Sequence, residues 1–223
     1  YLQRGEMTED EYKRVEDSIC PGCGICPVMA TASTMCTICE AGGMMLPGSS
    51  TVPAHSGQRL RVAKESGKAV VELVKRDLRP SKILSRSSVE NMIKVFLAVG
   101  GSTNAILHIL ALARELRMDL SLADFEVFIK ETPHLAALMP SYKYDMIDFH
   151  EAGGVGALLS ELRLLLDLDV MTCTGRTLNE NLIGAQNRNE DVIHTLKAPF
   201  KPPGSIRILR GNLAPNGRVA KPS

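Results

Sequence analysis

Residues 20–50, CPGCGICPVMATASTMCTICEAGGMMLPGSS, place a run of small side chains directly after a group of cysteines. Over residues 28–41 small side chains dominate and no glycine or proline interrupts them, which predicts a helix packed closely against its neighbours. Gly42 and Gly43 are expected to end this helix. The next stretch, LPGSSTVPA at 46–54, predicts a loop.

The composition of the 223-residue chain is that of an ordinary globular protein, with 44% hydrophobic and 23% charged residues. The formal net charge is +1 and no long basic run occurs, so we expect no nucleic-acid partner. No uninterrupted apolar run reaches about 18 residues, so we expect no membrane span. The chain begins with Tyr1 and stops shortly after the strand-like SIRILRG, and we therefore expect it to be a piece of a longer protein.

The distribution of the cysteines bears on the cellular compartment. Five of the six lie within residues 20–39, and the sixth is Cys173. Secreted disulfide frameworks instead spread their cysteines through a small chain that lacks a core. Because this chain is long enough to bury a core of its own, the bunched pattern indicates a reducing compartment. We expect a cytoplasmic protein, or a protein of an organelle matrix in a eukaryote.

Helical patterns cover most of the chain, and strands are sparse before its C-terminal end. The predicted helices lie at 7–19 with Thr8 as N-cap, at 28–41, at 56–78 with a break or kink at Ser66–Gly67, at 88–98 after Ser85 or Ser87, at 102–116, at 121–133 with Ser121 and Asp124 in a capping box, and after the glycines of 146–166.

The remaining patterns are those of strands, turns and a linker. Residues 134–144 predict a short strand or turn, and residues 170–182 predict a strand, a turn and a short helix. Alternating apolar residues at 205–220, with Gly-Asn and Asn-Gly turn signals, predict a hairpin. The stretch KAPFKPPG at 197–204 is the best candidate for a domain boundary.

The cysteine spacing allows metal binding without requiring it. Cys20, Cys23 and Cys26 form a C-x2-C-x2-C pattern, and Cys36 and Cys39 form a second C-x2-C. Thiolates at such spacing on a glycine-containing loop can converge on iron or zinc. A zinc knuckle needs a flexible loop between its two pairs, whereas a helix is predicted here. A ferredoxin-type run needs a fourth cysteine soon after the third, where none occurs.

Two interpretations of these cysteines therefore stay open on spacing alone. Cys36 and Cys39, three apart in a helix of small residues, are interpreted as packing residues. A zinc-binding interaction module would instead use Cys23, Cys26, Cys36 and Cys39.

The sequence GGSTN at 100–104 places two glycines and two hydroxyl residues at the start of a predicted helix. Free N–H groups there favour an anion, although a plain N-cap on Ser102 or Thr103 is the preferred interpretation. His108 is interpreted as a core histidine on the apolar face of this helix. The other histidines show no metal-ligand spacing and the carboxylates of Glu151, Glu190 and Asp191 are isolated, so no acid–base pair is assigned.

Eight segments, in order across residues 19–223, resemble the dihydroxy-acid and sugar-acid dehydratase family. They are CPGCGICPVMATASTM (20–35), GGMMLPGSS (42–50), VGGSTNAILHILALA (99–113), LADF (122–125), LMPSYKY (138–144), DFHEAGGV (148–155), TGRTLNENL (174–182) and ILRGNLAPNGRVAKPS (208–223). Any one of them is a weak signal, and eight in the same order are a strong one.

The resemblance implies an α/β fold. Residues 1–197 would be the helix-rich part of a large, layered α/β domain, and residues 198–223 the linker and first strands of a β-rich, barrel-like domain. It also implies a hydro-lyase that converts a 2,3-dihydroxy acid to a 2-keto acid. An iron–sulfur cluster, [2Fe–2S] or [4Fe–4S], would act as Lewis acid on the departing hydroxyl, and Mg²⁺ would hold the carboxylate end. A homodimer acting on a small molecule is implied as well.

The resemblance assigns one site residue to this chain. Cys26 occupies the family's cluster-ligand position in the C-x-x-M-x-T-A-x-T-M run, whereas Cys20 matches a non-ligand and Cys23 matches no ligand. The other cluster cysteines, the Mg²⁺ carboxylates and a modified lysine would lie upstream, and the proton-abstracting serine downstream. We therefore assign no catalytic residue and no Mg²⁺ ligand here, and expect the isolated chain to be inactive. GGSTN would be a structural wall near the active site.

Motifs within the family point to two substrates. The sequence TASTM resembles the sugar-acid dehydratases, whereas CPG, LPGSS and TGRTLNENL resemble the dihydroxy-acid dehydratases of branched-chain amino-acid synthesis. We favour the latter, with the sugar-acid dehydratase as the alternative within the family. The zinc-binding module and a structural fragment with inert cysteines are the alternatives from other classes.

Overall fold

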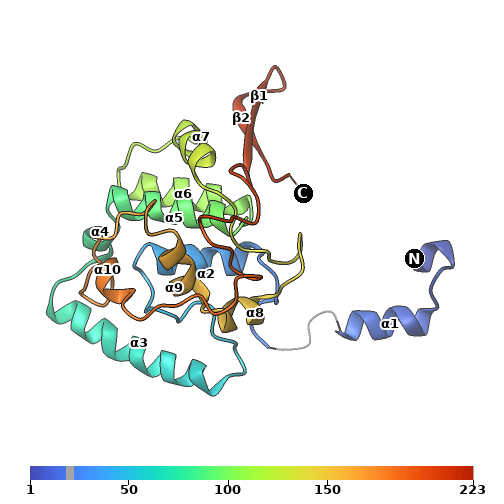
Figure 1. Cartoon of the computed structure of the whole chain (residues 1–223), viewed down its shortest axis with the longest axis horizontal. Coiled ribbons are helices and arrows are strands. Elements are labelled where there is room, and N and C mark those ends of the chain that lie inside the picture. Colours follow the sequence, from blue (N-terminus) through green and yellow to red (C-terminus); the bar gives the residue numbers. More distant parts are fainter. Residues whose placement is uncertain (19–22, 223) are drawn as a thin grey trace.

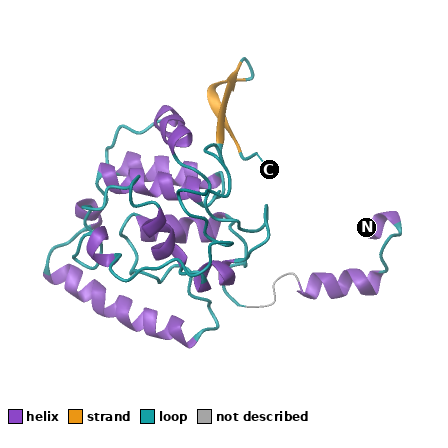
Figure 2. Ribbon diagram, viewed as in Figure 1, coloured by secondary structure: helices purple, strands orange, loops and turns teal. Residues whose placement is uncertain are grey.

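The computed structural model describes residues 1–18 and 23–222, and its body is built from helices (Figures 1 and 2). A short 3-10 helix, Leu2–Arg4, opens the chain. The α-helices are α1 Glu9–Ser18, α2 Thr31–Ala41, α3 Gly57–Lys75, α4 Pro80–Ile83, α5 Arg86–Ala98, α6 Asn104–Glu115, α7 Leu122–Glu131, α8 Met146–Glu151, α9 Gly154–Glu161 and α10 Leu178–Asn181. The strands are β1 Arg207–Gly211 and β2 Ala214–Ala220.

The core forms around α5, which packs against α2, α6 and α7. Its apolar side chains are buried almost completely, and Phe96 has no exposed surface. The small residues of α2 allow the backbones to approach closely. A Cβ atom on Gly42 would lie 2.7 Å from the Met92 sulfur, and one on Gly101 would lie 2.7 Å from Thr34. The predicted close packing of this helix is confirmed.

Helix ends agree well with the predictions from capping residues. Ser121 and Asp124 form the expected capping box of α7, and Ser85 caps α5 by accepting a hydrogen bond from the Ser88 N–H group. Thr8 accepts from the Glu11 N–H group at 3.2 Å before α1. These signals are local, so the sequence alone is sufficient to place them.

The structure corrects the predictions for α3 and for residues 80–84 and 146–151. The predicted break at Ser66–Gly67 is wrong, because α3 continues through it; glycine inside a helix costs only about 1 kcal/mol relative to alanine. None of the residues of α3 is buried, and Leu60 and Val74 are each 77% exposed. The short helices α4 and α8 were not predicted from the sequence.

The chain ends in an antiparallel pair of strands, so the predicted hairpin is confirmed (Figure 2). The Gly211–Asn212 signal lies at the turn, whereas Asn216 and Gly217 lie within β2. In the described part of the body, strand-like pairing is limited to isolated bridges, one of which joins His134 and Lys201. The helix-rich first part followed by β structure is confirmed. The boundary predicted at 197–204 stays a prediction.

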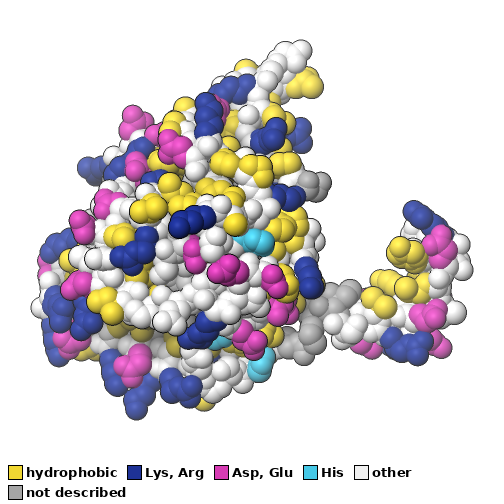
Figure 3. All heavy atoms as spheres, viewed as in Figure 1, with side chains coloured by type: hydrophobic (Ala, Val, Ile, Leu, Met, Phe, Trp, Pro, Cys, Tyr) yellow, Lys and Arg dark blue, Asp and Glu magenta, His cyan; other side chains and the backbone are white. Residues whose placement is uncertain are grey.

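The surface carries charges of both signs, interspersed over the face shown in Figure 3. Among the described residues, no helix is both long enough and apolar enough to cross a membrane. Helix α1 has no buried residue and lies apart from the other helices in Figure 1.

We predict that Phe96→Ala will lower the free energy of unfolding by about 3–5 kcal/mol, because it removes a fully buried ring from the centre of the core. Denaturant unfolding followed by circular dichroism measures this change. Leu107→Ala is the control: its side chain is 68% exposed, and it should change stability by less than about 0.5 kcal/mol. Equal effects of the two variants would contradict the core described here.

Candidate functional site

Two segments that are distant in the sequence line one cavity, which has a volume of about 680 Å³. Residues 23–27 lead into α2, and residues 50–55 follow it. Arg59 of α3 and the first residues of α8 complete the wall. The lining residues are Cys23, Gly24, Ile25, Cys26, Pro27, Ser50, Thr51, Val52, Pro53, Ala54, His55, Arg59, Met146 and Ile147.

Cys26 is half-buried and lies five residues before the first residue of α2. Backbone hydrogen bonds hold the residues that directly follow Cys26. The Met146 N–H group donates to the Pro27 carbonyl oxygen at 2.8 Å, and the Met29 N–H group donates to the Met139 carbonyl oxygen at 2.7 Å. The Cys26 side chain therefore has a fixed place at the cavity wall.

Three side chains from three helices hold the segment at 48–52. Glu40 accepts hydrogen bonds from the Gly48 N–H group at 2.7 Å and from the Ser50 N–H group at 3.0 Å. Arg59 donates to the carbonyl oxygens of Ser49 and Val52. Thr51 Oγ1 lies 2.8 Å from His150 Nδ1. Because residues 50–52 line the cavity, these contacts fix its shape.

Burial shifts the pKa values of two of these groups. Desolvation raises the pKa of Glu40, and the hydrogen bonds from residues 48–50 oppose that shift. Desolvation lowers the pKa of His150; Glu151 opposes this shift, whereas Arg188 and Arg59 reinforce it. The imidazole facing Thr51 is therefore held in its neutral form near pH 7. Sequence reasoning missed both groups, although Glu40 is the one acid in the small-residue run at 28–41.

The other cysteines are distributed over separate places. Cys23 lines the same cavity as Cys26. Cys39 lines a different cavity, of about 650 Å³, together with Met35 and Met92. Burial raises the pKa of the Cys39 thiol, with a smaller contribution from Cys36. Cys173 is buried and free, and Cys20 lies outside the described residues.

This distribution bears on both metal hypotheses. Within residues 1–18 and 23–222, no three His, Cys, Asp or Glu side chains are grouped so that they could hold a metal ion. The four cysteines of the zinc hypothesis are thus not brought together. An iron–sulfur cluster needs several thiolates, and the described residues bring Cys23 and Cys26 to one cavity. Two cysteines at one cavity are too few to hold such a cluster, so a cluster bound here would need further ligands from outside the described residues.

The GGSTN sequence connects the starts of α6 and α2. Ser102 Oγ lies 3.1 Å from Thr31 Oγ1, and Asn104 Nδ2 donates to the same hydroxyl at 2.9 Å. The Thr103 side chain makes no capping hydrogen bond, and Ser102 accepts from the Asn104 N–H group at 3.4 Å, so the predicted cap is at best weak. The sequence instead fixes the end of α2 that follows Cys26.

Two histidines, His108 and His134, differ in burial. His108 is exposed and lines the Cys39 cavity, so its assignment to the core is wrong. His134 is 2% exposed beside Gly100, and burial, reinforced by Lys221 and Lys201, lowers its pKa from 6.5 to about 4. It packs against the rings of Tyr142 and Phe200.

The family model for the dihydroxy-acid/6-phosphogluconate dehydratase N-terminal region matches residues 1–181. The chain belongs to this dehydratase family. The match covers the helical body that holds Cys26, Glu40 and the segment at 48–52, so the predicted resemblance is confirmed.

Several dehydratases are similar to the chain over its full length. It is 45% identical to the dihydroxy-acid dehydratase of Caldanaerobacter subterraneus subsp. tengcongensis over 100% of this chain and 40% of that protein. It is 43% identical to the dihydroxy-acid dehydratase of Nitratidesulfovibrio vulgaris over 100% of this chain and 41% of that protein. The Acetivibrio thermocellus dihydroxy-acid dehydratase is 43% identical over 98% of this chain and 40% of its own length. The chain thus spans about two fifths of the curated relatives it matches.

We predict that stability will fall with acidification through His134. Its pKa is lowered from 6.5 to about 4 on folding, so below pH 6.5 the unfolded chain takes up a proton that the folded chain does not. Between those pH values the unfolding free energy should lose about 3 kcal/mol through this group.

Denaturant unfolding at several pH values tests this, with His134→Phe as the variant that should lose this part of the slope. Tyr142→Phe alters the same aromatic cluster but keeps the imidazole, so it should keep the full slope. An unchanged slope in His134→Phe would contradict the prediction.

Proposed function

We propose that the protein carrying this chain is a hydro-lyase that converts a 2,3-dihydroxy acid to a 2-keto acid. Family membership and relatives named dihydroxy-acid dehydratase support this activity. The observation that carries the proposal is the position of Cys26. This residue lies in the family's motif and on the wall of the cavity of about 680 Å³ near the start of α2.

The proposed reaction removes hydroxide, which is a poor leaving group. An iron–sulfur cluster, when bound, would supply a Lewis acid for the departing oxygen, and Mg²⁺ would supply a second cation. In this chain Cys26 would contribute a thiolate ligand, with Cys23 lining the same cavity. The guanidinium of Arg59 brings positive charge to the wall, which favours an acidic substrate.

The cavity lining favours a branched-chain dihydroxy acid over a sugar acid. Ile25, Val52 and Ile147 line it together with two prolines. An apolar patch of this kind accommodates the alkyl substituent of a branched-chain acid. We extend the proposal to branched-chain amino-acid synthesis, to a homodimer and to a cytoplasmic location, on the strength of the family resemblance and the bunched cysteines.

The test is an anaerobic assay of the protein that carries this chain, with a branched 2,3-dihydroxy acid and with gluconate. Formation of the 2-keto acid from the branched substrate, at a kcat/KM well above that for gluconate, is expected. Preference for gluconate would favour the sugar-acid alternative. No keto acid from either substrate would overturn the proposal.

We predict that Cys26→Ser will abolish the visible absorbance of the cluster and the dehydratase activity, because a hydroxyl is a poor replacement for a thiolate ligand. Cys36→Ser is the matched control, since Cys36 lies in α2 and does not line the Cys26 cavity. It should keep both signals. If both variants instead lost bound zinc, the zinc-binding module would be favoured.

A further inference from the structure

The cavity wall at residues 50–52 is held by a carboxylate from the far end of α2. Glu40 is the penultimate residue of this helix and is 5% exposed. Its two oxygens accept separate hydrogen bonds, from the Gly48 and Ser50 N–H groups. Among the described residues, no lysine, arginine or histidine forms an ion pair with it; the ion pairs there involve other carboxylates.

A buried carboxylate without a cationic partner is costly to keep. Desolvation opposes its ionisation, and an apolar or neutral side chain at this position would avoid that cost. Both oxygens are nevertheless used by one short loop, and that loop lines the cavity beside Cys26. The contacts made by Glu40 therefore serve the shape of the cavity more directly than the packing of the core.

We propose that Glu40 is a positioning residue that holds residues 48–52 in the geometry of the Cys26 cavity. Cys26 lies five residues before α2 and Glu40 is the penultimate residue of this helix, so one rigid element connects the Cys26 segment to the loop at residues 48–52. Arg59 and His150 hold the same segment from α3 and α8, but both side chains are only partly buried. The effect on turnover rests on the proposed function, whereas the effect on the cavity does not.

A carboxylate suits this position because both partners are N–H donors. Glutamine offers one acceptor oxygen and would direct its own N–H₂ group at the other donor. In Glu40→Gln, at most one of the two hydrogen bonds survives and the loop must shift. A misplacement of about 1 Å near the reacting groups can reduce the rate about 100-fold. We therefore expect the shifted loop to reduce the rate by about 10-fold to 100-fold.

The experiment compares Glu40→Gln with the wild type in the full protein that carries this chain. Three quantities are measured: iron content, kcat/KM for a branched 2,3-dihydroxy acid, and the rate at which iodoacetamide alkylates Cys26 in iron-free protein. We expect iron to be retained, kcat/KM to fall by about 10-fold to 100-fold, and Cys26 to be alkylated several-fold faster.

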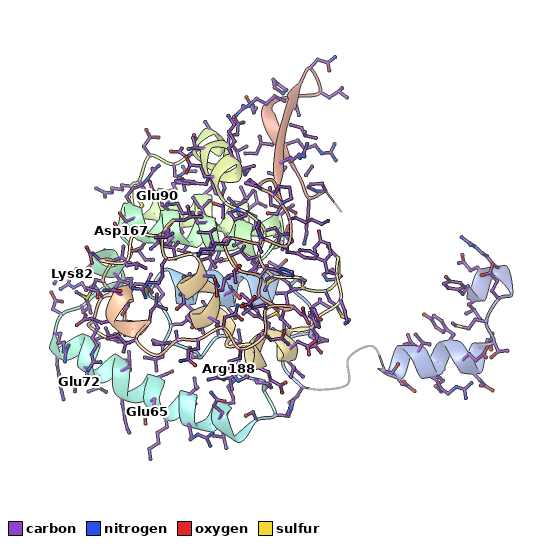
Figure 4. All side chains as sticks on the ribbon, viewed as in Figure 1. Glu65, Glu72, Lys82, Glu90, Asp167 and Arg188 are labelled. Atoms are coloured by element: carbon purple, nitrogen blue, oxygen red, sulfur yellow. The ribbon has the colours of Figure 1, made fainter. Side chains whose placement is uncertain are left out.

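Asn91→Ala is the matched control. Asn91 is fully buried on α5 and, like Glu40, makes two hydrogen bonds to the backbone of a loop. Its side chain donates to the Asp167 carbonyl oxygen at 2.7 Å and accepts from the Asp167 N–H group at 3.0 Å. Figure 4 places Asp167 near α4 and α5, on the other side of the body from α8. This variant should lose stability but keep wild-type kcat/KM and wild-type alkylation of Cys26.

Each outcome decides the proposal. Wild-type turnover and alkylation in Glu40→Gln would overturn it, and so would equal changes in Asn91→Ala. If Glu40→Gln does not fold, Glu40→Asp replaces it, since this variant keeps the charge but shortens its reach. A folded Glu40→Asp with reduced kcat/KM supports the proposal, and failure of both variants to fold overturns it. If the wild type dehydrates no dihydroxy acid, only the proposed function fails, and the alkylation rates still decide the role of Glu40.

Discussion

The close contact between α2 and α5 is the constraint on which the site depends. Small side chains along α2 let it lie against the buried face of α5, and Gly42 leaves room for Met92. An α-helix of 11 residues is about 16 Å long and stiff, so fixing it on the core also fixes what lies at its two ends. Cys26 precedes one end and lines the cavity, whereas Glu40, near the other end, holds the loop whose residues 50–52 line it.

The cavity combines rigid helices with the loop at residues 48–52, which has no regular secondary structure. Side chains from α2, α3 and α8 supply the order that such a loop would otherwise lack, through Glu40, Arg59 and His150. Loops held in this way commonly carry function, because the scaffold positions them while leaving their side chains free. By contrast, the carboxylates of α3, such as Glu65 and Glu72, point away from the body and pair with neighbouring lysines at the surface (Figure 4).

Local signals in the sequence were sufficient for the helix ends and for the hairpin. The capping box of Ser121 and Asp124 needs only four residues, and the small-residue pattern of α2 is visible in its own eleven. The partners of the site are different. Thr51 and His150 are 99 residues apart, so their contact depends on how α8 packs, and no local pattern indicates it. Spacing alone also left Cys26 ambiguous, and the resemblance to a family was what singled it out.

The most direct test of the account is the iron, acid-labile sulfide and zinc content of the protein carrying this chain, purified without oxygen. The account predicts iron and sulfide in comparable amounts and zinc well below one equivalent per chain, because we propose that Cys26 is a cluster ligand, and because the described Cys23, Cys26, Cys36 and Cys39 are not grouped as a zinc site. About one zinc per chain, without iron or sulfide, would contradict it.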